Sequence, residues 1–210
     1  MIISPSLEVL EKTTRQQLFN LFLLDEAESD VLASVMCESL RNTENCFRQS
    51  VNKYYIKDGE VFFSVYHSGQ YFIFLYWLSR QVFLNHPEYR QLADKIYCLN
   101  KALNGLDLYY EVVMPEVFHL DHPVGSVMGR ATYGSNFTFA QACTVGNNNG
   151  VYPVIGKNVQ MLSGAKILGQ CHIGDNVIVA ANAYIIDTDI PENSLVFGSS
   201  PNLVIKSRKC

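Results

Sequence analysis

The feature that most constrains this fold is a six-residue repeat in the second half of the chain. Nine apolar residues share one register of six, with a single interruption after Val145. They are Tyr133, Phe139, Val145, Ile155, Met161, Ile167, Ile173, Val179 and Ile185. A period of six fits neither the 3.6-residue turn of a helix nor the two-residue alternation of a strand. The repeat therefore favours a solenoid of short strands, with an ordinary β-sandwich as the alternative.

Each six-residue unit is predicted to form one strand and a sharp corner, so that three units close a triangular coil. The first residue of a unit should point inward, and coils should stack along a continuous core. The residue four places later should be small or apolar, because three such side chains meet inside. These residues are Phe137, Cys143, Val159, Ala165, Cys171, Val177 and Ala183. Glycine follows four of the nine inward residues, and we expect glycine, asparagine or aspartate to supply positive φ at the corners.

One interruption of the repeat predicts a loop. Val145 and Ile155 are ten residues apart instead of six, and the four extra residues lie within Asn147–Pro153. A solenoid accommodates an insertion on its outside, where such loops often carry a binding face.

The first half of the chain has a different pattern. Apolar residues recur at helical spacing within residues 7–24, 31–40, 69–83 and 92–103. Residues 52–64 lack this pattern and are expected to hold a loop. We therefore predict an α+β protein in three parts, with a helical domain over residues 1–104, a parallel β-helix over 105–198 and a tail over 199–210.

Composition excludes several classes of function. The net charge is −4 and the pI about 5.7, which argues against nucleic-acid binding. No apolar run approaches the ~18 residues of a membrane span, and no secretory signal is visible. The six cysteines form no CxxC pair and suit reduced thiols in the cytoplasm, so no metal is expected.

Four segments carry a family resemblance. They are LDHPVGSVMG (residues 120–129), AQACTVGN (140–147), GAKILGQCHIGDNV (164–177) and IPENSLVFGSSP (190–201). With them, the second half of the chain resembles the serine acetyltransferases, within the hexapeptide-repeat acyltransferases. The resemblance implies a left-handed parallel β-helix and a homotrimer or a dimer of trimers. It also implies acetyl-CoA bound in a groove between neighbouring solenoids.

The resemblance also implies catalytic residues. His122 matches the family's general base, and Asp107, fifteen residues earlier, matches the carboxylate that orients it. Asp121 matches the family's acceptor-binding aspartate. An alcohol is a poor nucleophile near pH 7, and a positioned imidazole that removes its proton accelerates attack by about 10²–10⁴-fold.

The donor site is expected along the solenoid. Family positions for pantetheine fall on the small residues Ser163, Gly164, Ala180 and Ala181, for which plain coil packing is the alternative. Lys206, with Arg208 and Lys209, is a candidate for the nucleotide phosphates or a solvated basic tail. A backbone N–H near Gly146 or Asn147 is the candidate for holding the oxyanion.

The sequence departs from the family at the predicted loop. The family loop ends Arg-His-Pro, whereas this one ends Val151-Tyr152-Pro153, so the arginine that would grip a carboxylate is absent. We therefore expect a sugar hydroxyl as acceptor, bound by Tyr152 and Asn147. Two alternatives stay open, a serine O-acetyltransferase of cysteine synthesis and a catalytically silent assembly solenoid.

Overall fold

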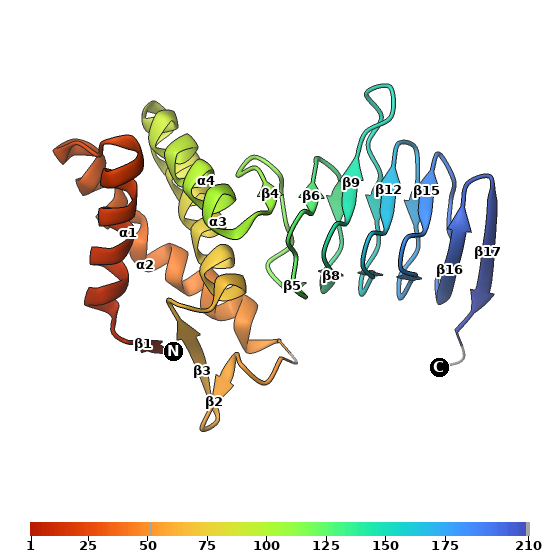
Figure 1. Ribbon diagram of the computed structural model, residues 1–210, viewed down its shortest axis with the longest axis horizontal. Coiled ribbons are helices and arrows are strands. Elements are labelled where there is room, and N and C mark those ends of the chain that lie inside the picture. The colour runs from red at the N-terminus through yellow and green to blue at the C-terminus, as the bar shows by residue number, and fades with distance from the viewer. Residues whose placement is uncertain (51, 209–210) are drawn as a thin grey trace. The chain divides into compact units, whose positions relative to one another are not determined.

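The computed structural model describes residues 1–50 and 52–208 (Figure 1). The chain divides into two compact units, Met1–Asn104 and Gly105–Cys210. Along the described residues, no helix is long and apolar enough to cross a membrane.

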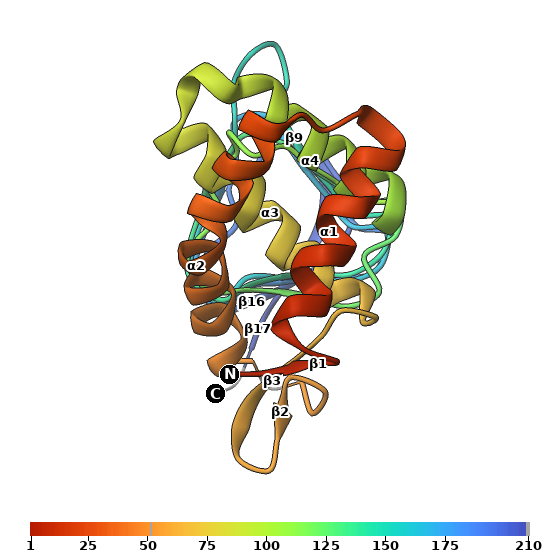
Figure 2. The same cartoon turned by 90° about the vertical axis from the view of Figure 1, so that its left-hand side faces the viewer.

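The first unit is built on four helices, as the sequence predicts. They are α1 (Leu7–Phe22), α2 (Glu26–Arg48), α3 (Ser68–Asn85) and α4 (Arg90–Asn104), with the short 3₁₀ turn η1 (Pro87–Tyr89) before α4. Figure 2 shows α3 in the middle of this unit, and every residue from Tyr71 to Leu78 is buried. An all-round apolar helix is stable only inside a core. The Tyr71 hydroxyl ties α3 to α1 by donating to Gln17 at 2.6 Å.

A small sheet stands where the sequence suggested a loop. It consists of β1 (Ile2–Ser4), β2 (Ile56–Lys57) and β3 (Glu60–Ser64), with β3 in the centre and β1 parallel to it. The buried Gln70 of α3 provides hydrogen bonds to backbone carbonyls in and beside this sheet. Its Nε2 donates to the carbonyl oxygens of Tyr54 and Phe62, each at 3.0 Å.

The second unit is a solenoid of parallel strands with three faces. The first face contains β5 (Phe118–Leu120), β8 (Phe137–Phe139), β11 (Gln160–Met161), β14 (Ile178–Val179) and β16 (Ser194–Ser199). The second contains β4 (Asp107–Leu108), β6 (Val127–Met128), β9 (Thr144–Gly146), β12 (Lys166–Leu168) and β15 (Tyr184–Ile186). The third contains β7 (Thr132–Tyr133), β10 (Val154–Ile155) and β13 (His172–Ile173).

The register of these strands confirms the repeat. Residues eighteen apart pair directly in later coils, as Gln160 does with Ile178 and Ile155 with Ile173. All nine predicted inward residues are buried, from Tyr133 at 8% exposure to Ile185 at 0%. The seven predicted companion positions are buried as well. Their burial builds the continuous axial core expected of stacked coils.

Glycine, asparagine and aspartate do supply positive φ at the corners, as Gly164, Asn158 and Asp187 show, but the glycines that directly follow inward residues do not. Gly134, Gly156 and Gly174 each follow an inward residue, but none of them has positive φ. A Cβ on Gly156 would lie 2.9 Å from the backbone of both Gly174 and Asp175 in the next coil. Glycine stands here because neighbouring coils approach too closely for any side chain.

At this edge of the solenoid, positive φ falls on asparagines two residues further along, a residue type predicted for the corners. Asn136, Asn158, Asn176 and Asn193 have φ of 54–60°, in the left-handed region that asparagine tolerates. Their side chains form a ladder in which each Nδ2 donates to the Oδ1 of the next asparagine at 2.9–3.0 Å. The ladder joins four coils along one edge.

The end of the solenoid is a hairpin. Strand β17 (Asn202–Ser207) runs antiparallel to β16, inside the region predicted to be a tail. Arg208 follows it and is held by its backbone N–H on Asn193 O and its Nη1 on Asn176 O, both at 2.8 Å. Lys209 lies outside the described residues.

Candidate active site

His122 lies in the turn that leads from β5 to β6. Its φ is 49°, and its side chain is 92% exposed. The turn is fixed by two backbone bonds, from Asp121 N to Phe139 O at 3.0 Å and from Val124 N to His122 O at 2.8 Å. A left-handed backbone on a residue other than glycine costs roughly 1–2 kcal/mol, and such strain gathers at functional sites. The imidazole is thus presented to solvent by a well-fixed turn.

Two aspartates accompany His122. Asp121 has its Oδ1 4.0 Å from His122 Nε2. Asp107, half-buried in β4, donates its backbone N–H to Ser126 O at 2.9 Å. Gly125 donates to Gly105 O at 2.7 Å, so β4 lies against the turn that carries His122. The orienting role of Asp107 stays a prediction.

The predicted donor residues lie on the same edge of the solenoid as His122. We call this the His122 edge, the turns that lead from the first face to the second. Ser163 and Gly164 occupy that turn two coils beyond His122, and Ala180 and Ala181 occupy it one coil further. Gly164 donates to Gln141 O and Asn182 donates to Ser163 O, both at 2.8 Å, so the turns stack directly. The result is a line of small residues leading away from the imidazole.

The predicted outer loop is confirmed as a hairpin that projects after β9 (Figure 1). Asn148 and Val151 form an antiparallel bridge with two backbone bonds of 3.0 Å. Asn149 and Gly150 make the tight turn, with φ of 50° and 82°, which is the pairing that such hairpins prefer. Val151 is 45% exposed and Tyr152 42%. The insertion therefore offers an apolar side chain and a phenol to solvent.

The hairpin occupies a different edge from His122. We call it the hairpin edge, the turns that lead from the second face to the third. Asn147 and Tyr152 belong to it, Gly146 is the last residue of β9 before it, and the three residues of β9 separate it from the His122 edge. At about 3.3 Å per residue, that strand alone spans about 10 Å. Within one chain, the predicted acceptor-binding residues Asn147 and Tyr152 are not brought to His122.

Lys206 lies in β17, where its side chain is exposed. Its Nζ is 5.7 Å from the centre of the Phe197 ring, a cation–π distance. An exposed ammonium that lies over a ring face can still direct its hydrogen-bond donors outward, so Lys206 is a candidate partner for an anionic group.

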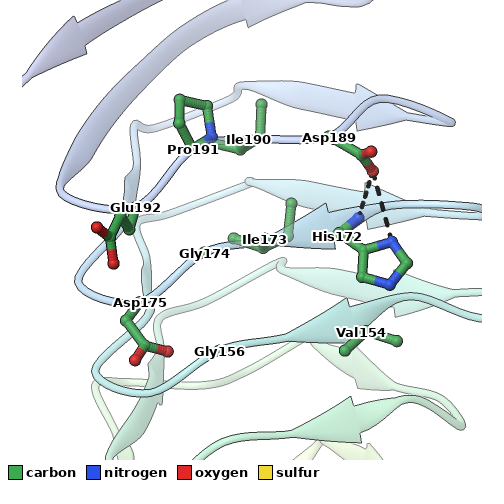
Figure 3. A pocket seen from close by; sticks show the side chains of 10 residues that line it. All are labelled: Val154, Gly156, His172, Ile173, Gly174, Asp175, Asp189, Ile190, Pro191 and Glu192. Carbon is green, nitrogen blue, oxygen red and sulfur yellow. Dashed lines mark hydrogen bonds and ion pairs between the residues drawn. The ribbon is translucent and has the colours of Figure 1, made fainter.

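Two further histidines of the solenoid have no predicted role. His172 on the third face borders a shallow depression (Figure 3), where its backbone N–H donates to Asp189 Oδ1 at 2.7 Å and its ring Nδ1 is 3.6 Å from the same oxygen. His119 in β5 is more enclosed, and burial lowers its pKa below the ordinary value although a hydrogen bond with Asn136 opposes this. Within residues 1–50 and 52–208, no three His, Cys, Asp or Glu side chains are grouped to hold a metal ion.

Sequence comparison relates the repeat to known enzymes. The family described as bacterial transferase hexapeptide (six repeats) matches residues 152–187. A serine acetyltransferase of Helicobacter pylori (strain ATCC 700392 / 26695) is 29% identical over 122 residues, which cover 56% of this chain and 71% of that protein. One of Staphylococcus aureus (strain N315) is 30% identical over 117 residues, 53% of this chain and 54% of its own length.

Solved structures share the fold over nearly the whole chain. A serine acetyltransferase of Neisseria gonorrhoeae superposes with a TM-score of 0.75 at 20% identity, covering 96% of this chain and 80% of that one. One of Brucella abortus strain S19, in complex with coenzyme A, gives 0.70 at 18%, covering 99% and 84%. The fold is thus a helical domain followed by a left-handed parallel β-helix, as predicted. With its repeat, its motifs and these relatives, the second half of the chain is similar to the serine acetyltransferases, and its repeat matches the hexapeptide model over residues 152–187.

Proposed function

We propose that this protein is an acetyl-CoA-dependent O-acetyltransferase in which His122 is the general base. The observation that carries the proposal is the placement of His122, an exposed imidazole with Asp121 4.0 Å away, at the start of a line of small residues. Such an edge leaves room for an extended thioester beside a base. A Brucella abortus relative of the same fold has been solved in complex with coenzyme A.

The reaction balances as an acyl transfer. The acceptor oxygen attacks the thioester carbonyl carbon while His122 removes the hydroxyl proton. The resulting oxyanion is held by backbone N–H groups, for which Gly146 and Asn147 are our candidates. The C–S bond then breaks, the departing thiolate receives the proton from His122, and the products are an O-acetyl ester and free coenzyme A. Asp107 is our candidate for orienting the ring.

Binding of the donor is assigned to the His122 edge. Ser163, Gly164, Ala180 and Ala181 are small enough to let pantetheine approach the backbone. Lys206, with its exposed ammonium, is the candidate for a phosphate of the nucleotide.

The active site requires a second copy of the chain. His122 lies on one edge of the solenoid and the hairpin on another, so one chain alone leaves the base and Tyr152 apart. A ring of three copies would bring the His122 edge of one beside the hairpin edge of the next. We therefore propose a homotrimer or a dimer of trimers, and sedimentation equilibrium tests it. A monomer with full activity would contradict this arrangement.

Serine is the first candidate for the acceptor. The relatives found by sequence are serine acetyltransferases, and a Neisseria gonorrhoeae relative has been solved in complex with serine. Asp121 could then accept from the ammonium of serine. A sugar hydroxyl is the second candidate, because Val151 and Tyr152 offer the acceptor no cation for a carboxylate, while Tyr152 and Asn147 offer neutral hydrogen bonds.

Release of coenzyme A thiol, followed with acetyl-CoA against serine and a panel of sugars, tests the proposal. Efficient turnover of serine selects the first acceptor, and turnover of sugars alone selects the second. A thermal-shift titration accompanies the assay, because a ligand at 100 times its dissociation constant stabilises the folded protein by ~2.7 kcal/mol. With neither turnover nor a shift, the catalytic proposal fails and the silent solenoid takes its place.

A further inference from the structure

The hairpin is attached to the solenoid by a contact far away in the sequence. The side-chain amide of Asn148 donates from Nδ2 to Asp187 Oδ2 at 2.5 Å, across 39 residues. The second carboxylate oxygen, Oδ1, accepts the backbone N–H of Gln170 at 2.8 Å. Asp187 therefore links the hairpin to two later coils.

Gly169 leaves the space that this contact needs. It has φ of 76°, and a Cβ there would collide with Asp187 Oδ1 and stand 2.7 Å from Asn148 Cβ. Asp187 is itself fixed in the left-handed region, with φ of 46°, and its backbone N–H donates to Leu168 O at 3.1 Å. Three residues from three coils thus hold one another in place.

We propose that Asp187 is a positioning residue that holds the hairpin, and with it Tyr152, in the geometry that binds the acceptor. Asn148 is bonded across the hairpin to Val151, the residue before Tyr152, while Pro153 behind it is buried. The outgoing arm of the hairpin is held by the buried Pro153. The incoming arm is held by the bond from Asn148 to Asp187. This inference rests on the proposed function, since it assigns Tyr152 to the acceptor.

The test exchanges the hydrogen-bond donor at position 148 with the hydrogen-bond acceptor at position 187. In Asn148→Asp two carboxylates face each other, and in Asp187→Asn two amide groups do, so each single variant loses the charge-assisted bond. The double variant, which combines the two substitutions, restores it in reverse, and the amide carbonyl introduced at position 187 can still accept from Gln170. Asp189→Asn is the matched control, because Asp189 accepts a backbone N–H in the same way from His172 and the bonds of its side chain do not reach the hairpin.

Each single variant should raise KM for the acceptor about fivefold to twentyfold, with kcat changed less than about twofold, as expected for a lost charge-assisted bond. KM for acetyl-CoA should stay constant, and the double variant should return close to the wild type. Amide exchange at Val151, whose N–H bonds to Asn148 O, should accelerate about tenfold in the single variants only. A residue that only stabilised the coil would not raise KM for the acceptor while leaving kcat and KM for acetyl-CoA almost unchanged, and the double variant would not restore the wild-type values.

Three results would overturn the inference, of which the third concerns the Asp189→Asn control. The first is unchanged exchange at Val151 in both single variants, and the second is a double variant as impaired as the worse single variant. Amide exchange can be measured without any turnover, so it tests whether Asp187 holds the hairpin even in an inactive protein. If the wild type acetylates nothing, that result refutes the proposed function and leaves the role of Asp187 in holding the hairpin to be decided by exchange. Equal impairment in Asp189→Asn would likewise assign the effect to general loss of coil stability.

Discussion

His122 Nε2 lies 4.0 Å from the Asp121 Oδ1 of the preceding residue, and both side chains are exposed, at 92% and 72%. Neither side chain supports the core. Removing either one should therefore affect chemistry much more than folding.

His122→Ala should lose most turnover, about 10²-fold or more, because the base that removes the acceptor proton is gone. The melting temperature and the assembly state should stay as in the wild type. His172→Ala is the matched control, since that ring is also exposed and also lies near a carboxylate, 3.6 Å from Asp189. Steady-state kinetics with both variants decides the matter, and equal losses in the two would mean that His122 is not the base.

Val151→Arg should raise kcat/KM for serine about tenfold, because a guanidinium in the hairpin could pair with the serine carboxylate. Val151 is 45% exposed, so the longer side chain has room. Val154→Arg, on the third face outside the hairpin and 39% exposed, serves as control. Unchanged serine kinetics in Val151→Arg would show that the hairpin does not face the acceptor carboxylate.

Acid should destabilise the protein through His119. Burial lowers the pKa of this histidine in the folded state below its ordinary value of 6.5. As pH falls through 6.5, the unfolded chain binds the proton first, so the free energy of unfolding falls, by at most about 1.4 kcal/mol per pH unit for one group. Well above pH 6.5 His119 is neutral in both the folded and the unfolded chain, so it contributes no slope there.

The variant His119→Gln isolates this contribution, because glutamine keeps a hydrogen-bonding group toward Asn136 but does not titrate. Urea unfolding measured from pH 5 to 8 should give a flatter profile below pH 6.5 for the variant than for the wild type. Identical profiles would show that His119 is not what makes stability depend on pH.

Gly156→Ala should destabilise the solenoid by about 1–3 kcal/mol, because the added methyl group meets backbone atoms of the next coil at 2.9 Å. Gly146→Ala is the control of the same sequence type. Its methyl group would meet only the flexible end of Leu168, at 3.3 Å, and should cost less. Thermal unfolding measures both, and a larger loss at Gly146 would contradict the close-approach explanation.

Much of the solenoid can be predicted from the sequence because each coil is specified by residues that are close together in the chain. The burial of Ile167 or Val179 is fixed by a period of six, and a four-residue insertion can only become an outer loop. The reason for the glycines is not local, since it is the next coil that excludes a side chain at Gly156. Strand β1 is similarly hidden, because its Ile2 pairs with Phe62, sixty positions later.

The candidate site also contains residues that local sequence predicts and residues that only contacts distant in the sequence reveal. His122 and Asp107 are predicted from motif and spacing and their roles stay predictions, whereas the sequence offers no signal for Asp187, because its bond to Asn148 crosses the hairpin insertion and two coils. The separation of the His122 edge from the hairpin edge also needs three dimensions. It depends on which corner of the triangle each insertion or motif occupies.

The asparagine ladder has a consequence for how such a chain can change in length. Asn158 and Asn176 make the same donor and acceptor bonds to their neighbours, so one more coil, inserted in register after Asp187, would extend the ladder and shift β17 along the axis. Asn148, Gly169 and Asp187 all precede that point and would keep the contacts that they make with one another. The molecule can therefore lengthen by whole coils at its far end while the hairpin contact stays in place.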